Sequence, residues 1–314
     1  MNLFYIIAGL VVLIFGGDWL LKASVNISMR LKISRIVIGM TVVSFATSAP
    51  ELIVSIKSAL DGFPDLALGN VIGSNIANIA FVLGITVCFG SIAVGKSFYT
   101  TDWPVMMLAS LLLYAFIGFD YVITRVEGII LVSLLILFLV YLLRSKNNQL
   151  ENLDDLDLDD EIIPLNKTLI FLVLGGVGLW GGSELLIKGA VGLAEQIGIS
   201  ERIIGVTIVS MGTSVPELAA SIIAVIKKEK AISLGNLIGS NIFNILAVLG
   251  ITSIITPIKV GDLQIVTNDI YWMLGISFSI FPLCFIPTKL KFGLKEGLLL
   301  LTTYSLFIYF TVFK

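Results

Sequence analysis

The chain contains no histidine, only two cysteines and few charged residues. The lack of histidine excludes His-ligated zinc sites, Ser-His or Cys-His catalysis and histidine proton relays. Cys88 and Cys284 both lie in apolar surroundings and predict no disulfide framework. Charged residues make up 13% of the 314 and hydrophobic residues 57%, whereas a soluble domain has roughly 25% charged residues. This composition indicates a membrane protein, and the net charge of −2 gives no support for nucleic-acid binding.

Long apolar segments follow one another along the chain. Because a bilayer core about 30 Å thick needs about 20 apolar residues per helix, we expect an all-α membrane protein with ten transmembrane helices. The expected spans are 3–26, 36–57, 68–91, 104–119, 126–143, 168–190, 202–226, 233–256, 270–287 and 295–313. The first is expected to be a retained span, since it lacks the basic start and the small-residue cleavage site of a signal peptide.

The acidic segment 144–167 is the only long hydrophilic stretch and divides the chain into two sets of five spans. If the N-terminus is outside, 14 of the 20 Lys and Arg residues fall at inner ends. The positive-inside rule then predicts extracellular termini and a cytoplasmic linker. The linker lacks the glycine and the spacing of an EF-hand, so we expect a solvated linker and not a regulatory Ca²⁺ site.

The two halves of the sequence are repeats. A shift of 166 superposes 39–86 on 205–252 without a gap, with 26 of 48 positions identical. We therefore expect two five-helix repeats, at 1–143 and 168–314. Because five is odd, the second repeat must enter the membrane from the opposite side, and inverted repeats are typical of secondary transporters.

The most polar segments of the second and seventh spans are "TSAPELIVS" (47–55) and "TSVPELAAS" (213–221). Helical spacing places their polar residues on one face of each helix. These residues are Ser44, Ser48, Glu51 and Ser55, with Thr47 beside them, and Ser210, Ser214, Glu217 and Ser221, with Thr213 beside them. A mid-membrane carboxylate costs at least about 2.5 kcal/mol, so we expect Glu51 and Glu217 to face a polar cavity.

Pro50 and Pro216 precede the two glutamates. A proline gives no N–H and crowds the carbonyl four residues earlier, so carbonyls near Ala46–Thr47 and Gly212–Thr213 are expected to leave the helical ladder. Released carbonyls, hydroxyls and carboxylates form a set of hard oxygen ligands suited to Na⁺ and Ca²⁺. The alternative is an ordinary proline kink, which does not explain why each copy carries a glutamate.

The third and eighth spans open with "GNVIGSNIAN" (69–78) and "GNLIGSNIFN" (235–244). An amide–hydroxyl–amide face recurs at i, i+4 and i+8, and each segment carries a GxxxG that favours close helix packing. We interpret these faces as the other wall of the cavity. Their residues are Asn70, Ser74 and Asn78, and Asn236, Ser240 and Asn244.

Two acid–base pairs at i, i+4, Asp18–Lys22 and Glu184–Lys188, occupy the first and sixth spans. We expect them to be interfacial ion pairs that help set the depth of the helices.

The segments "TSAPE…GNVIGSNIAN" and "TSVPE…GNLIGSNIFN" resemble the paired α-repeats of the sodium/calcium exchangers, prokaryotic type, in the cation/Ca²⁺ antiporter superfamily. The resemblance implies alternating access, with the first and sixth spans sliding past a fixed core. It also implies bound Na⁺ and Ca²⁺ as transported substrates, with no other cofactor.

The resemblance implies a role for each matching residue. Glu51 and Glu217 would hold Ca²⁺ with the carbonyls of Thr47 and Thr213, and Asn78 and Asn244 would line the middle. Flanking Na⁺ sites would use the Ser44 carbonyl, Ser48 and Ser74, and the Ser210 carbonyl, Ser214 and Ser240.

The chain departs from the family pattern at two places. Ala46 stands where the second repeat has Gly212, the more usual residue, and both Asn78 and Asn244 are amides where some members carry an aspartate. Two carboxylates balance one Ca²⁺ and disfavour potassium co-transport, which supports plain Na⁺/Ca²⁺ exchange.

Three other functions are alternatives to an electrogenic Na⁺/Ca²⁺ exchanger of the cell membrane. A Ca²⁺/H⁺ exchanger would carry protons on the glutamates, and a passive channel would conduct without a counter-ion. An intramembrane enzyme is disfavoured because the chain has no histidine and no GxSxG motif. The sequence leaves the stoichiometry and the oligomeric state open, a monomer included.

Overall fold

The computed structural model describes residues 1–144, 163–196 and 210–313. The chain folds into two compact units. Unit 1 comprises Met1–Thr47 and Phe138–Asn236, and unit 2 comprises Ser48–Leu137 and Leu237–Lys314. Each unit therefore combines segments from both halves of the sequence. The first residues of the expected seventh span, 202–209, and most of the linker, 145–162, lie outside the described residues.

Unit 1 is built on two long helices and several short ones. The long helices are α1 (Asn2–Leu31) and α9 (Leu165–Gln196). The short ones are α2 (Arg35–Ile38), the π-helix η1 (Gly39–Val43), α3 (Ser44–Thr47), α11 (Ser210–Gly212) and α12 (Val215–Ile226). The end of α8 (Arg125–Arg144) and the start of α13 (Lys230–Phe243) also belong to this unit.

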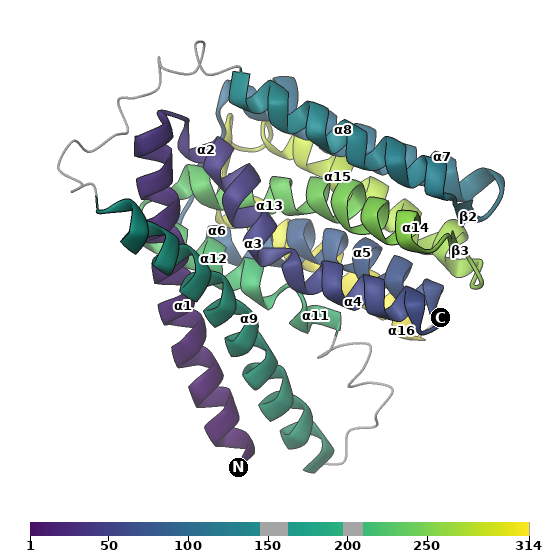
Figure 1. Ribbon diagram of the computed structural model, residues 1–314, viewed down its shortest axis with the longest axis horizontal. Coiled ribbons are helices and arrows are strands. Elements are labelled where there is room, and N and C mark those ends of the chain that lie inside the picture. The colour runs from purple at the N-terminus through teal and green to yellow at the C-terminus, as the bar shows by residue number, and fades with distance from the viewer. Residues whose placement is uncertain (145–162, 197–209, 314) are drawn as a thin grey trace. The chain divides into compact units, whose positions relative to one another are not determined.

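Helices α1 and α9 pack along each other (Figure 1). Small residues allow this approach: a Cβ added to Gly178 would lie 3.0 Å from the Cα of Gly16. Helix α12 contacts both long helices. The pair exposes large apolar side chains such as Phe4, Ile14 and Val173, as expected of helices that face lipid.

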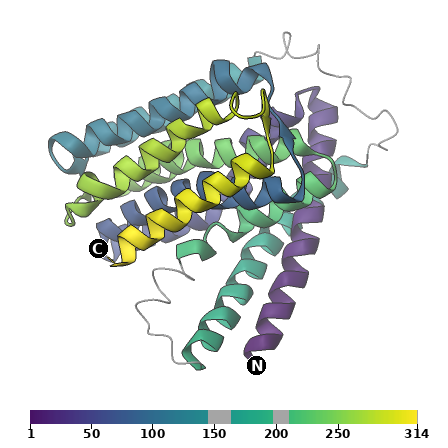
Figure 2. The ribbon, with the colours of Figure 1, turned by 180° about the vertical axis from the view of Figure 1, so that it is seen from behind.

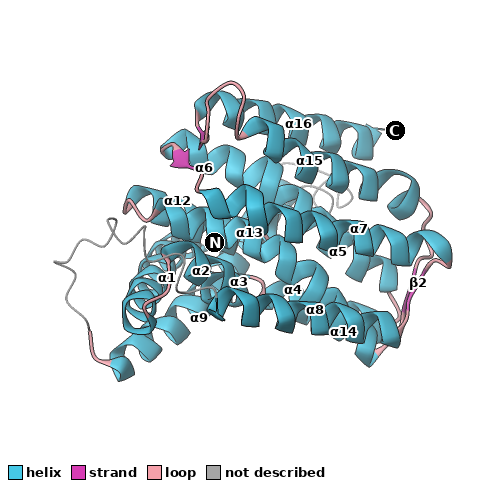
Figure 3. Cartoon of the chain, turned by 90° about the horizontal axis from the view of Figure 1, so that it is seen from above, coloured by secondary structure: helices cyan, strands magenta, loops and turns pink. Residues whose placement is uncertain are grey.

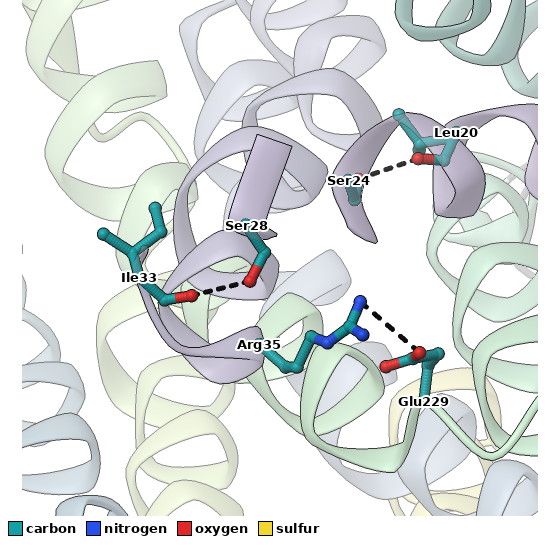
Figure 4. Close-up of polar contacts among 6 residues, drawn as sticks. All are labelled: Leu20, Ser24, Ser28, Ile33, Arg35 and Glu229. Atoms are coloured by element: carbon teal, nitrogen blue, oxygen red, sulfur yellow. Dashed lines mark hydrogen bonds and ion pairs between the residues drawn. The ribbon is translucent and has the colours of Figure 1, made fainter. Parts of the chain in front are cut away.

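The chain reverses direction sharply after α1 (Figure 4). Lys32 ends the helix in the left-handed region, with φ 52° and ψ 47°, a conformation common at helix C-termini. The Oγ of Ser28 donates to the Ile33 carbonyl at 2.6 Å. Buried Arg35 then lies 3.4 Å from the carboxylate of Glu229, so an ion pair joins the start of α2 to the segment that precedes α13.

Unit 2 contains the remaining helices and two short antiparallel strand pairs. Its helices include α4 (Ala49–Leu60), α5 (Pro64–Ile76), η2 (Ala77–Leu83), α6 (Gly84–Phe89), η3 (Phe98–Asp102) and α7 (Trp103–Phe119). They continue with η7 (Asn244–Leu249), α14 (Gly250–Ile255), η8 (Ile265–Asp269), α15 (Ile270–Leu283) and α16 (Leu294–Phe313).

Four two-residue strands pair across unit 2. Strand β1 (Ile92–Ala93) pairs antiparallel with β4 (Lys291–Phe292), and β2 (Val122–Ile123) pairs with β3 (Ile258–Lys259). Position 92 plus 166 is position 258, so β1 and β3 occupy matching places in the two halves of the sequence.

The core of unit 2 is formed by α5, η2 and η7. Helix α5 contacts α4, α15 and η7, while α16 lies against α6 and η2 on the side seen in Figure 2. The neighbouring helices α7 and α15 are seen from above in Figure 3. Leu68, Val71, Ile76 and Leu246 are at most 2% exposed, so the side chains at the centre of this unit are fully covered.

The expectation of an all-α membrane protein agrees with the structure. Among the described residues, six helices are long and apolar enough to cross a membrane, or seven if the interrupted helix Arg35–Leu60 counts as one span. The six are Asn2–Leu31, Pro64–Phe89, Phe98–Phe119, Arg125–Arg144, Leu165–Leu193 and Lys230–Ile255.

Candidate cation-binding site

The helix of the second expected span is interrupted at Ser48. Helix α3 ends at Thr47 and α4 begins at Ala49, and Ser48 between them has φ −87° and ψ 3°. Pro50 occupies the first turn of α4, a position where its missing N–H is tolerated. The proline therefore starts a new helix instead of kinking a continuous one.

The seventh expected span has the same break. Helix α11 ends at Gly212, α12 begins at Val215, and Ser214 has φ −89° and ψ 3°, close to the values of Ser48. The carbonyl of Gly212 accepts a hydrogen bond from the Oγ of Ser183 at 2.8 Å. This carbonyl was expected to leave the helical ladder, and a side chain of α9 now partners it.

Both glutamates lie in the first turn after a break. Glu51 in α4 and Glu217 in α12 each have 0% of their surface exposed. The N-terminal end of a helix carries a partial positive charge that stabilises an anion. The two breaks thus hold two buried carboxylates in the same local geometry, one in each unit.

In unit 1, the hydroxyl groups of the first break meet Asn236. The Oγ of Ser44 donates to the Asn236 carbonyl at 3.0 Å, and the Oγ1 of Thr47 donates to its Oδ1 at 3.1 Å. The Nδ2 of Asn236 donates to the Oγ of Ser221 at 3.2 Å. One asparagine therefore joins polar residues of the second and seventh expected spans.

In unit 2, Asn70 makes the matching contact. Its Nδ2 donates to the Oγ of Ser55 at 3.1 Å and to the carbonyl of Glu51 at 3.4 Å. Adding 166 to positions 55 and 70 gives 221 and 236, so the Ser–Asn contact occurs at equivalent places in the two halves. The expected polar faces of the third and eighth spans do turn toward the broken helices.

The inner asparagines, Asn78 and Asn244, are fully buried, and only the nitrogen of each amide has a hydrogen-bond partner among the described residues. The Nδ2 of Asn244 donates to the Oγ of Ser74 at 3.0 Å. Within the part of the chain that the structure describes, the Oδ1 atoms of Asn78 and Asn244 accept no hydrogen bond. A buried acceptor of this kind requires a donor or a cation, so these two oxygens suit a cation that they would ligate.

Several of these residues lie in or next to π-helices, which often mark functional sites. Helix η1 ends immediately before Ser44, η2 contains Asn78 and η7 contains Asn244.

The twelve predicted site residues divide evenly between the units. Unit 1 holds Ser44, Thr47, Ser210, Thr213, Ser214 and Glu217. Unit 2 holds Ser48, Glu51, Ser74, Asn78, Ser240 and Asn244. Ser210 begins α11, and of the eleven residues whose burial is described, all but half-buried Thr213 are buried. Within unit 2 the structure brings together Ser74 and Asn244 directly.

The structure also shows contacts that the sequence did not predict. Asn75 and Asn241 are buried beside the inner asparagines, and Ser183 partners the Gly212 carbonyl. The repeat carried a signal for Asn75 and Asn241, since they are identical under the shift of 166. Ser183 carried none, because the equivalent position is Gly17.

The two predicted ion pairs have different outcomes. Asp18 lies 2.7 Å from Lys22 as predicted, and also 3.0 Å from Lys227 at the end of α12. The prediction for Glu184 and Lys188 is wrong: both residues are described, and no ion pair joins them. The Nζ of Lys188 instead lies 4.8 Å from the ring centroid of Tyr5.

Comparisons with known proteins find ion exchangers and antiporters that match nearly the whole chain. A family described as "Sodium/calcium exchanger protein" matches residues 1–144 and 167–313. A protein of Alkalimonas amylolytica that bears the antiporter name CaxA is 38% identical over 305 residues, 96% of this chain and 95% of that protein. The sodium/calcium exchanger MaX1 of Methanosarcina acetivorans is 27% identical over 347 residues, covering 98% of this chain and 97% of its own. A solved structure of the sodium-calcium exchanger NCX_Mj superposes with a TM-score of 0.80 at 30% identity, covering 97% of both chains.

Proposed function

Because the chain belongs to the sodium/calcium exchanger family, we propose that it exchanges Na⁺ for Ca²⁺ across the cell membrane by alternating access. The observation that carries the proposal is the repeated break, in which a buried glutamate follows Thr-Ser-x-Pro twice. Oxygen ligands around such breaks suit Na⁺ and Ca²⁺.

The proposed ligands are the twelve residues named above. Glu51 and Glu217 supply the two negative charges that balance one Ca²⁺, and the carbonyls of Thr47 and Thr213 assist them. The Na⁺ ligands are the Ser44 carbonyl, Ser48 and Ser74, and their counterparts, the Ser210 carbonyl, Ser214 and Ser240. The amide oxygens of Asn78 and Asn244, which accept no hydrogen bond from the described residues, support their place as neutral ligands.

Exchange follows from competition for the same carboxylates. Bound Ca²⁺ and bound Na⁺ use the same two carboxylates, so each ion displaces the other. Each ion also shifts the population of the protein toward the conformation that binds that ion better. If the three-to-one ratio that the family resemblance implies applies, each cycle moves one net positive charge with the Na⁺, and transport is electrogenic.

The membrane arrangement is part of the proposal. The chain forms ten spans in two inverted repeats, 1–143 and 168–314, joined by the acidic linker. Both termini are extracellular and the linker cytoplasmic, as the distribution of Lys and Arg favours. The equivalent Asn70–Ser55 and Asn236–Ser221 contacts support the repeat.

The deciding experiment measures ⁴⁵Ca²⁺ uptake into proteoliposomes loaded with Na⁺ and diluted into Na⁺-free buffer, with the potential clamped by K⁺ and valinomycin. We expect uptake that requires the outward Na⁺ gradient. An inside-negative potential should slow it, because net positive charge leaves the vesicle. Vesicles reconstituted with the Glu217→Gln variant serve as the matched control.

Each other outcome contradicts the proposal in a different way. Uptake that is independent of the Na⁺ gradient and depends on an imposed pH gradient would show Ca²⁺/H⁺ exchange. Uptake that needs no counter-ion would show a channel.

A further inference from the structure

Asn75 and Asn241 occupy equivalent places in the two halves, each directly after the serine of a Gly-Ser-Asn segment. Both belong to unit 2 and are 1% exposed. The Oδ1 of Asn75 accepts from the Nδ2 of Asn244 at 3.1 Å, and the Oδ1 of Asn241 accepts from the Nδ2 of Asn78 at 3.5 Å. Each therefore contacts the inner asparagine of the other half.

The orientation of these amides is fixed by groups that only accept hydrogen bonds. The Nδ2 of Asn75 faces the backbone carbonyl of Asn241 at 3.3 Å and the Sδ of Met273 at 3.9 Å. The Nδ2 of Asn241 faces the Sδ of Met106 at 3.7 Å. Since a carbonyl and a thioether cannot donate, the nitrogen of each amide must point to them and the oxygen must point the other way.

The orientation of Asn75 and Asn241 in turn determines the orientation of the inner asparagines. The oxygen of Asn75 requires the nitrogen of Asn244 to face it, and the oxygen of Asn241 requires the nitrogen of Asn78. The oxygen of an amide diverges from its nitrogen, so the Oδ1 atoms of Asn244 and Asn78 turn away from these partners. They are the buried oxygens that accept no hydrogen bond among the described residues.

We propose that Asn75 and Asn241 are positioning residues that make Asn244 and Asn78 present oxygen, and not N–H, to the transported cation. The inference rests on the proposed function. An amide turned the other way would direct its N–H dipole at a cation and repel it. Groups that orient metal ligands in this way typically change metal affinity by 10–100-fold when removed.

The two amide–amide hydrogen bonds differ in length. Asn75 meets Asn244 at 3.1 Å and is anchored by a backbone carbonyl, whereas Asn241 meets Asn78 at 3.5 Å and faces a sulfur. Hydrogen bonds weaken toward this longer distance. Asn75 should therefore matter more than Asn241.

The main test replaces each residue with leucine, which has a similar shape and no polar group. In proteoliposomes, Asn75→Leu should raise the half-saturating Ca²⁺ concentration of Na⁺-dependent uptake roughly tenfold, and Asn241→Leu should raise it less. Ser110→Ala is the control, because it removes another buried hydrogen bond, the one to the Met106 carbonyl, without touching the amides. It should leave half-saturation unchanged.

The outcomes separate this inference from the proposed function. Wild-type protein without Na⁺-dependent uptake would refute the function itself. Wild-type exchange with an unchanged half-saturation in Asn75→Leu, whether or not the maximal rate falls, would refute the positioning role.

If Asn75→Leu does not fold, two more conservative variants test the positioning role, since Met→Leu conserves core volume well. Met106→Leu removes the sulfur that orients Asn241, whereas Met273→Leu leaves Asn75 anchored on the Asn241 carbonyl. We expect a higher half-saturating Ca²⁺ concentration in Met106→Leu than in Met273→Leu. Equal values in the two variants would overturn the inference.

Discussion

Replacing Glu217 with glutamine is expected to reduce Na⁺-dependent Ca²⁺ uptake by roughly 100-fold or more while the protein stays folded. Glutamine keeps the shape of the side chain but removes one of the two buried charges proposed to balance Ca²⁺. Removing one partner of a buried charge pair costs about 3–5 kcal/mol, which corresponds to at least roughly 100-fold in binding or rate. Glu51→Gln should behave alike, because Glu51 has the same burial and helix position.

The measurement is initial ⁴⁵Ca²⁺ uptake in proteoliposomes, normalised to the amount of protein that elutes as a single species. Glu127→Gln is the matched control. Glu127 accepts hydrogen bonds from the backbone N–H and hydroxyl of Thr124 at the start of α8, and glutamine retains an oxygen for them. Normal uptake in either Glu51→Gln or Glu217→Gln would remove these residues from the site.

The second large effect is expected on stability, from Gly39→Ala in unit 1. A Cβ at this position would lie 2.4 Å from the carbonyl oxygen of Ile232 and 3.0 Å from the Cα of Gly235. Both neighbours are backbone atoms, so the helix must move to make room. Overpacking of this kind costs about 3 kcal/mol, and the shift would also stretch the Ser44–Asn236 hydrogen bond of 3.0 Å.

The measurement is the apparent melting temperature in detergent, followed by tryptophan fluorescence. Gly181→Ala supplies the control in the same unit, because a Cβ there meets no atom within 4 Å among the described residues. We expect a clear fall in melting temperature for Gly39→Ala and little change for Gly181→Ala. Similar melting temperatures for the two variants would show that the close approach at Gly39 is not needed.

The sequence by itself determined the class of the protein and the places where its helices break. Composition required a membrane, because so few charged residues cannot cover a soluble surface. The proline before each glutamate predicted the interruptions now seen at Ser48 and Ser214, since proline removes a donor wherever it stands. The repeat identified the same polar residues twice.

Only the tertiary structure decided how those residues are used. Helical spacing placed Ser74 and Asn78 on one face, but it could not show whether the oxygen or the nitrogen of each amide is hydrogen-bonded. That depends on Asn75, Asn241 and two methionine sulfurs that come from distant parts of the chain. The π-helices η2 and η7 also change the local turn, and sequence periodicity does not reveal them.

The division into compact units was equally outside the reach of the sequence. The repeat divides the chain at its linker, whereas packing joins Met1–Thr47 with Phe138–Asn236 and gives the remainder to unit 2. The physical reason is that a repeat records local pattern, while packing depends on which surfaces are complementary. Gly16 and Gly178 allow α1 and α9 to pack together although they lie in different halves.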